Sequence, residues 1–341
     1  MKKPMIPAVS FIKAISALGV VSCHFFTRMA NMDTYLILNY LNGSWGDAFV
    51  QVFLIVSGFL LHYHYQDNLE LKNYAVKRWR GIFPMFYIAY LYFMYGKVCD
   101  WRSVFYYGNP WAYLLTLTGM DGYTMARLPS YYIIGEWFLG AIIILYILYP
   151  LLRKAFQKSA VGTFAFTAAL YLVFYDRPIT NAYGLWTISS CLVSFALGML
   201  IREYREVFTG KRSVAAAVAV VILLVTVFIP SGRNLSTHLM GAALFVILYN
   251  AGGKIMGFRP AGTVFQLLGD LSYPIYLLHN QIVPRIAASW QPGNPIKGWA
   301  LFAITCILTV IAAKALDVVT RSVMRWADAQ IAKRKPCKQL G

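Results

Sequence analysis

The chain has 341 residues, of which 59% are hydrophobic and only 13% carry charge, whereas about a quarter of the residues in a soluble domain are charged. This composition excludes an ordinary water-soluble fold. The formal net charge of +18 would suit a nucleic-acid-binding protein if the basic residues formed one stripe, but here they separate apolar runs, a distribution typical of membrane proteins with basic cytoplasmic loops.

Ten apolar runs are long enough to cross a hydrocarbon layer, which takes roughly 20 helical residues. The first run follows MKKP, is interrupted by Lys13 and lacks a clear small-residue cleavage site, so we expect an uncleaved helix rather than a signal peptide. Placing both termini in the cytoplasm puts most of the 31 Lys and Arg residues on that side. The sequence therefore predicts an all-α integral membrane bundle of about ten transmembrane helices near residues 8–26, 45–65, 82–96, 131–152, 160–175, 183–201, 213–229, 236–251, 264–284 and 298–320.

Two segments between the predicted spans have other patterns. Residues 66–81 mix charged residues with Leu, Tyr and Trp at helical spacing, which predicts an amphipathic helix on the inner membrane surface. Residues 97–130 are rich in Trp, Tyr and Gly and form the longest outer segment, a candidate lid or substrate-contacting loop. We expect a single transmembrane domain over residues 1–325, followed by a short basic cytoplasmic tail over 326–341.

The five cysteines stand singly along the chain. They lack the paired spacing of a disulfide framework or a zinc site. We therefore expect neither a structural disulfide nor a metal site.

Ionisable residues inside the predicted spans are the first candidates for function, because a buried charge in a bilayer is costly unless it is paired or hydrated. Lys13 and His24 are eleven residues apart in the first span, which is about 1100° of helical rotation, so they share one face at different depths. Glu136 opens the fourth span at the depth of His24. The alternatives are a snorkelling lysine, a structural histidine and an interfacial carboxylate beside Trp137.

A second histidine, His279, lies in the ninth predicted span. Ser272 and Tyr276 precede it by seven and three residues on the same helical face. These two residues could orient the imidazole ring and fix its tautomer. Alternatively, His279 is a structural histidine that bridges two helices of the bundle.

A basic cluster of Lys77, Arg78 and Arg80 precedes the third predicted span on the cytoplasmic side. Such a cluster can clamp phosphate groups through charge-assisted hydrogen bonds. It also fits an ordinary cytoplasmic flank in contact with anionic lipid.

Four short motifs follow one another along the chain. They are the basic residue and ten others before a histidine (Lys13, His24), the run VQVFLIVSGFLL that contains Ser57, the basic cluster that ends in IFPMFY, and LGDLSYPIYLLH, which ends at His279. In this order, and over essentially the whole chain, they resemble acyltransferase family 3, a family of membrane acyltransferases.

The chain departs from the family pattern at several positions. Lys13 stands where the family usually has arginine, which keeps the charge but loses the bidentate guanidinium. Gly81 occupies the second position of the usual arginine pair, and Glu136 precedes Trp137, whereas in other members the glutamate follows the tryptophan. The extracellular esterase-like domain that some members append is not expected here.

The resemblance implies transfer of an acetyl or other acyl group from cytoplasmic acyl-CoA to a sugar hydroxyl of the envelope, a capsule or an exopolysaccharide, by a multi-pass protein of the bacterial inner membrane. Acyl-CoA is then a donor substrate, no cofactor is bound permanently, and the partners are a carbohydrate acceptor and membrane lipid rather than nucleic acid. The expected roles are general base for His24 with Glu136 or His279 orienting it, donor contacts for Lys13, Ser57, Lys77, Arg78 and Arg80, and acceptor contacts for Asp47, Trp137 and Tyr276.

Two alternatives from other functional classes stay open, a transporter and a sensor or scaffold without turnover. A multi-span transporter or flippase for an envelope lipid or sugar could use the same buried charges as a proton relay. Such transporters usually have paired halves with broken helices, a pattern that the sequence does not display.

Overall fold

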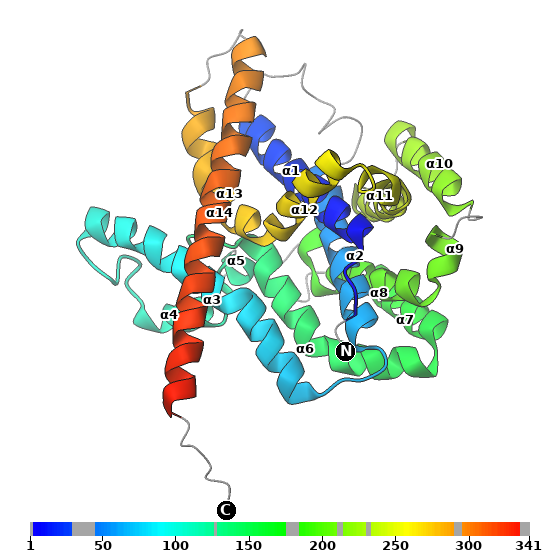
Figure 1. Ribbon diagram of the computed structural model, residues 1–341, viewed down its shortest axis with the longest axis horizontal. Helices are drawn as coiled ribbons and strands as arrows, with labels where there is room; N and C mark the ends of the chain where they lie inside the picture. Colours follow the sequence, from blue (N-terminus) through cyan, green and yellow to red (C-terminus); the bar gives the residue numbers. More distant parts are fainter. Residues whose placement is uncertain are drawn as a thin grey trace, which may run out of the picture.

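The computed structural model describes residues 3–28, 45–125, 128–174, 184–209, 214–229, 233–289 and 295–334, and the regular elements in these ranges are all helices (Figure 1). Two are single 3-10 turns, at Pro110–Ala112 and Gly184–Trp186. The others are α1 (Pro7–Arg28), α2 (Trp45–Tyr65), α3 (Leu71–Trp101), α4 (Tyr113–Leu117), α5 (Asp121–Thr124), α6 (Glu136–Lys158), α7 (Ala160–Val173), α8 (Ile188–Glu203), α9 (Arg205–Thr209), α10 (Ala215–Phe228), α11 (Arg233–Ile255), α12 (Arg259–Asp270), α13 (Ser272–Ala287) and α14 (Pro295–Arg334).

Six helices in the described ranges are long and apolar enough to cross a membrane, namely α1, α2, α3, α6, α11 and α14. Two further apolar helices, α7 and α10, have 14 residues each. The prediction of an all-α protein is confirmed, and the described helices include six with the length and composition of a membrane span.

Two predicted boundaries differ from the structure. The expected surface helix at 66–81 and the expected span at 82–96 are parts of one helix, α3, which passes through Pro84. The expected unbroken span at 264–284 is instead divided at Leu271 into α12 and α13. The break places Pro274 in the first turn of α13, where its missing amide hydrogen leaves no helical hydrogen bond unmade.

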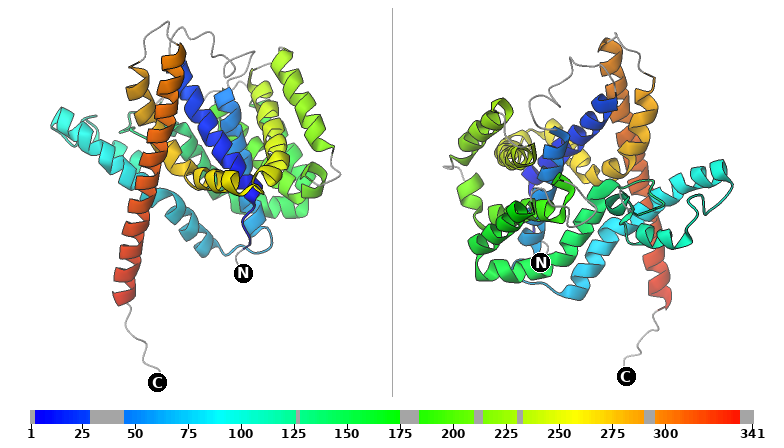
Figure 2. Two further views of the ribbon diagram at one scale, coloured as in Figure 1. Left: turned by 45° about the horizontal axis from the view of Figure 1, so that its top comes forward. Right: turned by 180° about the vertical axis from the view of Figure 1, so that it is seen from behind.

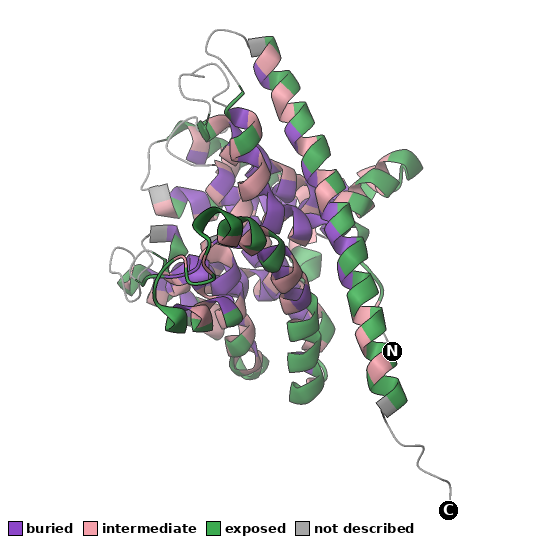
Figure 3. Cartoon of the chain, turned by 90° about the vertical axis from the view of Figure 1, so that its left-hand side faces the viewer, coloured by how far each residue is buried: buried purple, intermediate pink, exposed green. Residues whose placement is uncertain are grey.

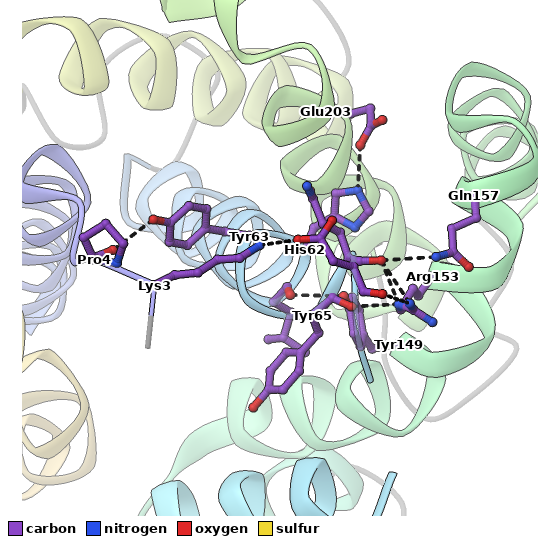
Figure 4. Close-up of polar contacts among 12 residues, drawn as sticks. Lys3, Pro4, His62, Tyr63, Tyr65, Tyr149, Arg153, Gln157 and Glu203 are labelled. Carbon is purple, nitrogen blue, oxygen red and sulfur yellow. Dashed lines mark hydrogen bonds and ion pairs between the residues drawn. The ribbon is translucent and has the colours of Figure 1, made fainter. Parts of the chain in front are cut away.

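The first two long helices run antiparallel, and their contacts define a near end of the molecule. At this end Lys3 forms an ion pair of 2.7 Å with Asp67, and the Tyr63 hydroxyl donates to the carbonyl oxygen of Pro4 at 3.0 Å (Figure 4). Arg153 of α6 donates to the carbonyl oxygen of Tyr65 at 2.7 Å, which satisfies a backbone group that the end of α2 leaves without a helical partner. The opposite, far end holds the last turn of α1 and the first turns of α2 and α6.

Helices α2 and α8 pack with their backbones in direct contact, and glycine makes this approach possible. A Cβ atom at Gly58 would lie 1.9 Å from the carbonyl oxygen of Phe195, and one at Gly198 would lie 1.9 Å from that of Ile55. Because glycine has no Cβ, the two helices come closer than any other residue at these positions would permit. Gly58 follows Ser57 directly, so this packing also positions Ser57.

Burial is greatest inside the bundle and lowest on the final helix. Figure 3 shows buried residues gathered among the central helices, whereas the helix that leads to the C-terminus is exposed over most of its length. That helix, α14, packs on α13 and on α3 and extends beyond the other helices at its C-terminal end (Figure 2). An exposed apolar surface of this kind is expected for a helix that faces lipid.

Candidate functional site

A cavity of about 250 Å³ lies among α1, α2, α3, α6, α12 and α13. Its wall includes Lys13, Ser57, Arg78, Asp270 and Tyr276. All four family-like motifs therefore contribute to this cavity, because α1, α2, α3 and α13 each place a motif residue in its wall. The helices bring these residues together from positions more than 250 residues apart in the sequence.

Lys13 is accompanied in this cavity by a carboxylate that the sequence analysis missed. Asp270, the last residue of α12, lies close enough to Lys13 to interact electrostatically. Its side chain also accepts a hydrogen bond of 2.9 Å from Gln266. Lys13 was chosen because a charged residue within an apolar span is a functional candidate. The same criterion applies to Asp270 in LGDLSYPIYLLH and would have identified it.

The structure separates the three members of the basic cluster. Arg78 lines the cavity, where its guanidinium lies over the rings of Tyr65 and Tyr146 at 5.7 and 5.6 Å from their centroids. Arg80 instead forms a bidentate ion pair with Asp328 of α14, at 2.6 and 2.9 Å. Lys77 is exposed and does not line the cavity.

Ser57 lines the cavity and donates a hydrogen bond of 2.8 Å to the carbonyl oxygen of Phe53, four residues earlier in α2. This bond is typical of serine inside an apolar helix, where the hydroxyl has few other acceptors. Ser57 therefore forms part of the cavity wall while its hydroxyl hydrogen is engaged by a backbone carbonyl group.

The two candidate histidines lie side by side. The rings of His24 on α1 and His279 on α13 have centroids 4.9 Å apart and are tilted by 60°. His279 is fully buried, and its Nδ1 lies 2.7 Å from the carbonyl oxygen of Tyr276. A carbonyl oxygen only accepts, so Nδ1 carries the proton and Nε2 is the basic nitrogen of the neutral ring.

Tyr276 joins the cavity to the beginning of α6. Its hydroxyl accepts a hydrogen bond of 3.0 Å from the amide of Leu139 and donates to the carbonyl oxygen of Gly135. Gly135 has a φ of 87°, a conformation that favours glycine, and it directs the chain into α6. Glu136 is the first residue of this helix, and its side chain lies outside the described residues.

The remaining predicted residues lie near the far end but do not line the cavity. Trp137 stacks on Trp186, with ring centroids 5.6 Å apart and an angle of 20°. Asp47 is half-buried in the first turn of α2.

The cavity and the histidine pair are neighbouring parts of one site. Neither His24 nor His279 lines the cavity, but Tyr276 contributes to the cavity wall while its backbone carbonyl holds the His279 ring. The site therefore presents cationic groups at one level and two imidazoles at another, since His24 lies about three turns of α1 beyond Lys13.

Comparisons with known proteins identify the family of the chain. The acyltransferase domain model of acyltransferase family 3 matches residues 6–317. The chain is also similar to a Bacillus subtilis (strain 168) protein named "Putative peptidoglycan O-acetyltransferase YrhL", with 23% identity over 370 residues. That match covers 93% of this chain and 55% of the relative, so the chain spans about half the relative's length.

No solved structure matches the chain. The family match, in contrast, extends over almost the entire sequence and includes all four motifs. The family predicted from the motifs is thereby confirmed, and the chain belongs to acyltransferase family 3.

Proposed function

We propose that this protein is a membrane O-acetyltransferase that transfers an acetyl group from acyl-CoA to a hydroxyl of an envelope, capsular or exopolysaccharide sugar. The family supports acyl transfer, and the name of the B. subtilis relative supports an acetyl group and a glycan acceptor. The observation that carries the proposal is the position of Tyr276. Its side chain lines the cavity that contains Lys13 and Arg78, and its carbonyl oxygen accepts a hydrogen bond from His279 of the imidazole pair.

In this proposal the protein crosses the bacterial inner membrane about ten times, with both termini and the near end in the cytoplasm. The six long apolar helices supply part of this topology. Shorter apolar helices and the broken pair α12 and α13 supply the rest. The basic residues around the near end, among them Lys3 and Arg153, agree with a cytoplasmic location.

The donor would enter from the near end. Arg78 and Lys13 would hold its phosphate groups through charge-assisted hydrogen bonds, and the narrow pantetheine arm would extend along the cavity towards Tyr276. The carboxylate of Asp270 would favour the charged form of Lys13, against the cost of burying a charge in the otherwise apolar wall.

The chemistry would occur at the histidine pair. His24 takes the proton from the acceptor hydroxyl as general base while the hydroxyl oxygen attacks the thioester carbonyl. The C–S bond then breaks, and the departing thiolate takes a proton from the imidazolium of His24. His279 or Glu136 orients His24, and the hydrogen bond from His279 to the carbonyl oxygen of Tyr276 fixes the tautomer of His279.

The first test removes the proposed base. His24→Gln should reduce acetylation of the glycan by at least about 100-fold, the scale of general base catalysis, without lowering the melting temperature of the purified protein. A stable His24→Gln protein that acetylates its glycan at the parental rate would remove His24 from the mechanism.

The second test concerns the donor and uses two arginines that are two residues apart in α3 and face different sides of that helix. Arg78→Gln should weaken acetyl-CoA binding to the purified protein about tenfold or more, as expected for loss of a charged partner in a partly buried site. Arg80→Gln, which breaks only the ion pair with Asp328, is the matched control and should bind the donor normally. A transporter would bind no acetyl-CoA, and equal effects of the two substitutions would contradict the donor site.

A further inference from the structure

A second cavity, of about 530 Å³, opens beside the end of α3. Aromatic rings dominate its wall, and two of them are largely in contact with solvent, since Trp101 is 64% and Tyr107 53% exposed. Large exposed aromatic side chains around a hollow indicate a binding surface, because they bury apolar area only when a ligand covers them. We call this cavity the outer cleft. Its polar and aromatic wall residues are Lys97, Trp101, Tyr106, Tyr107, Ser130 and Tyr132.

The residues behind the wall of the outer cleft are closely packed, because the ring of Tyr131 contacts the rings of the wall residues Tyr106 and Tyr107. Tyr131 is fully buried and stacks on Tyr113 with ring centroids 3.8 Å apart and an angle of 5°. The hydroxyls of Tyr90 and Tyr106 donate to the carbonyl oxygen of Tyr131, at 2.6 and 3.4 Å. A surface fixed by its own packing loses little conformational freedom when a ligand binds.

The outer cleft is connected to the proposed active site by a short strap of chain. Ser130 lines the cleft, and five residues later Gly135 accepts the hydrogen bond from Tyr276. Five extended residues reach at most about 18 Å. Between them, the carbonyl oxygen of Ile133 accepts a hydrogen bond of 2.7 Å from Gln281 of α13, which holds the strap on the helix that carries His279.

The chemistry of the wall identifies the kind of ligand. Flat aromatic faces beside hydroxyl groups suit the apolar faces and polar rims of sugar rings. Lys97 stands four residues before Trp101, on the same face of α3, and adds a positive charge for a carboxylate or phosphate group. Aromatic residues that only anchor a protein in the membrane interface project singly from its surface into lipid, whereas these four rings line one hollow together with Lys97 and Ser130.

We propose that the outer cleft is a remote subsite for an acidic glycan chain, which holds sugar rings several units away from the ring that is acetylated. This inference rests on the proposed function and adds that the acceptor is an oligomer or polymer. The strap between Ser130 and Gly135 sets the separation between the bound rings and the histidine pair.

The test uses the full-length protein in detergent and the unacetylated envelope polysaccharide of a deletion strain, depolymerised into single-ring and six-ring fractions. Acetyl transfer to each fraction is measured for the wild type, Trp101→Ala, Lys97→Gln and Trp111→Ala. Trp111 is 76% exposed in the same segment but does not line the cleft, so its variant is the matched control. Binding of the six-ring fraction without donor is measured by calorimetry.

Trp101→Ala should raise KM for the six-ring fraction about tenfold or more, as loss of an aromatic anchor does, with kcat unchanged and no effect on the single-ring fraction. Lys97→Gln should raise the same KM about two- to fivefold, an effect that salt removes. Trp111→Ala should match the wild type on both fractions.

The inference is overturned if Trp101→Ala behaves like Trp111→Ala, or if it lowers kcat equally on both fractions. It is also overturned if the wild type does not bind the six-ring fraction in calorimetry. If the wild type binds that fraction through Trp101 but transfers no acetyl group to it, the proposed function fails and the glycan subsite stands.

Discussion

The hydroxyl of Tyr276 is a single atom on which two parts of the site depend. It bridges the amide of Leu139 and the carbonyl of Gly135, the backbone pair that closes the first turn of α6. The same turn carries Glu136 and Trp137. We therefore expect Tyr276→Phe to keep the aromatic wall of the cavity while releasing the start of α6.

The size of the effect follows from the two hydrogen bonds that are lost. Each contributes a net 0.5–1.5 kcal/mol in a typical protein, so the pair is worth about 1–3 kcal/mol. The amide and the carbonyl remain able to bond to each other, so neither is left buried without a partner. If the bonds serve to place the reacting groups, kcat falls by about 5- to 150-fold, while KM for acetyl-CoA stays the same because Lys13 and Arg78 are intact.

The assay compares kcat, KM and the melting temperature of Tyr276→Phe with those of Tyr149→Phe. Tyr149 is also buried and donates a hydrogen bond of 3.0 Å to a backbone carbonyl, that of Leu61, but it lies at the near end and outside the cavity wall. Tyr149→Phe should affect stability only. A Tyr276→Phe protein with parental kcat, or equal losses of kcat in both variants, would refute the positioning role of Tyr276.

Two further outcomes follow from the packing and from one buried carboxyl group. Gly58→Ala puts a Cβ 1.9 Å from the carbonyl oxygen of Phe195. It should therefore destabilise the protein by about 1–3 kcal/mol in thermal unfolding, whereas Gly81→Ala, which meets no atom within 4 Å, should not; equal melting temperatures would contradict the close packing of α2 and α8. Burial raises the pKa of Asp121 to about 6, so the stability of its neutral form is present below about pH 4 and lost as pH rises through about 6. Asp121→Asn should accordingly gain up to about 3 kcal/mol over the wild type near pH 8 and nothing near pH 4, and a gain that is the same at both pH values would show that the carboxyl group does not titrate in this way.

The residues of the candidate site divide into those that local patterns could identify and those that they could not. Lys13, His24 and His279 stand out in the sequence because they interrupt apolar helices, and such an interruption is visible in a window of 20 residues. The choice between Arg78 and Arg80 was not visible in this way. It depends on Asp328, which is 248 residues from Arg80 in the chain and forms its ion pair with Arg80 rather than with Arg78.

Helix boundaries show the same division. Hydropathy correctly predicts apolar helices at 8–26 and 45–65, since each stands between polar segments. Hydropathy wrongly predicts two elements in the region of α3. The charged first half and the apolar second half differ in composition, although they form one helix. Hydropathy also joins α12 to α13, because it does not register that Pro274 favours the first turn of a helix.

By itself, the sequence determined the family, the all-helical class and most of the candidate residues, because motifs and hydrophobic runs are properties of neighbouring residues. Only the tertiary structure decided which of these residues share a cavity, that Asp270 accompanies Lys13, and that the two histidine rings lie together. The outer cleft likewise depends on how the residues of its wall pack on one another. These features arise from contacts between helices that are distant in the chain, and helix periodicity fixes which face a residue occupies but not which helix that face meets.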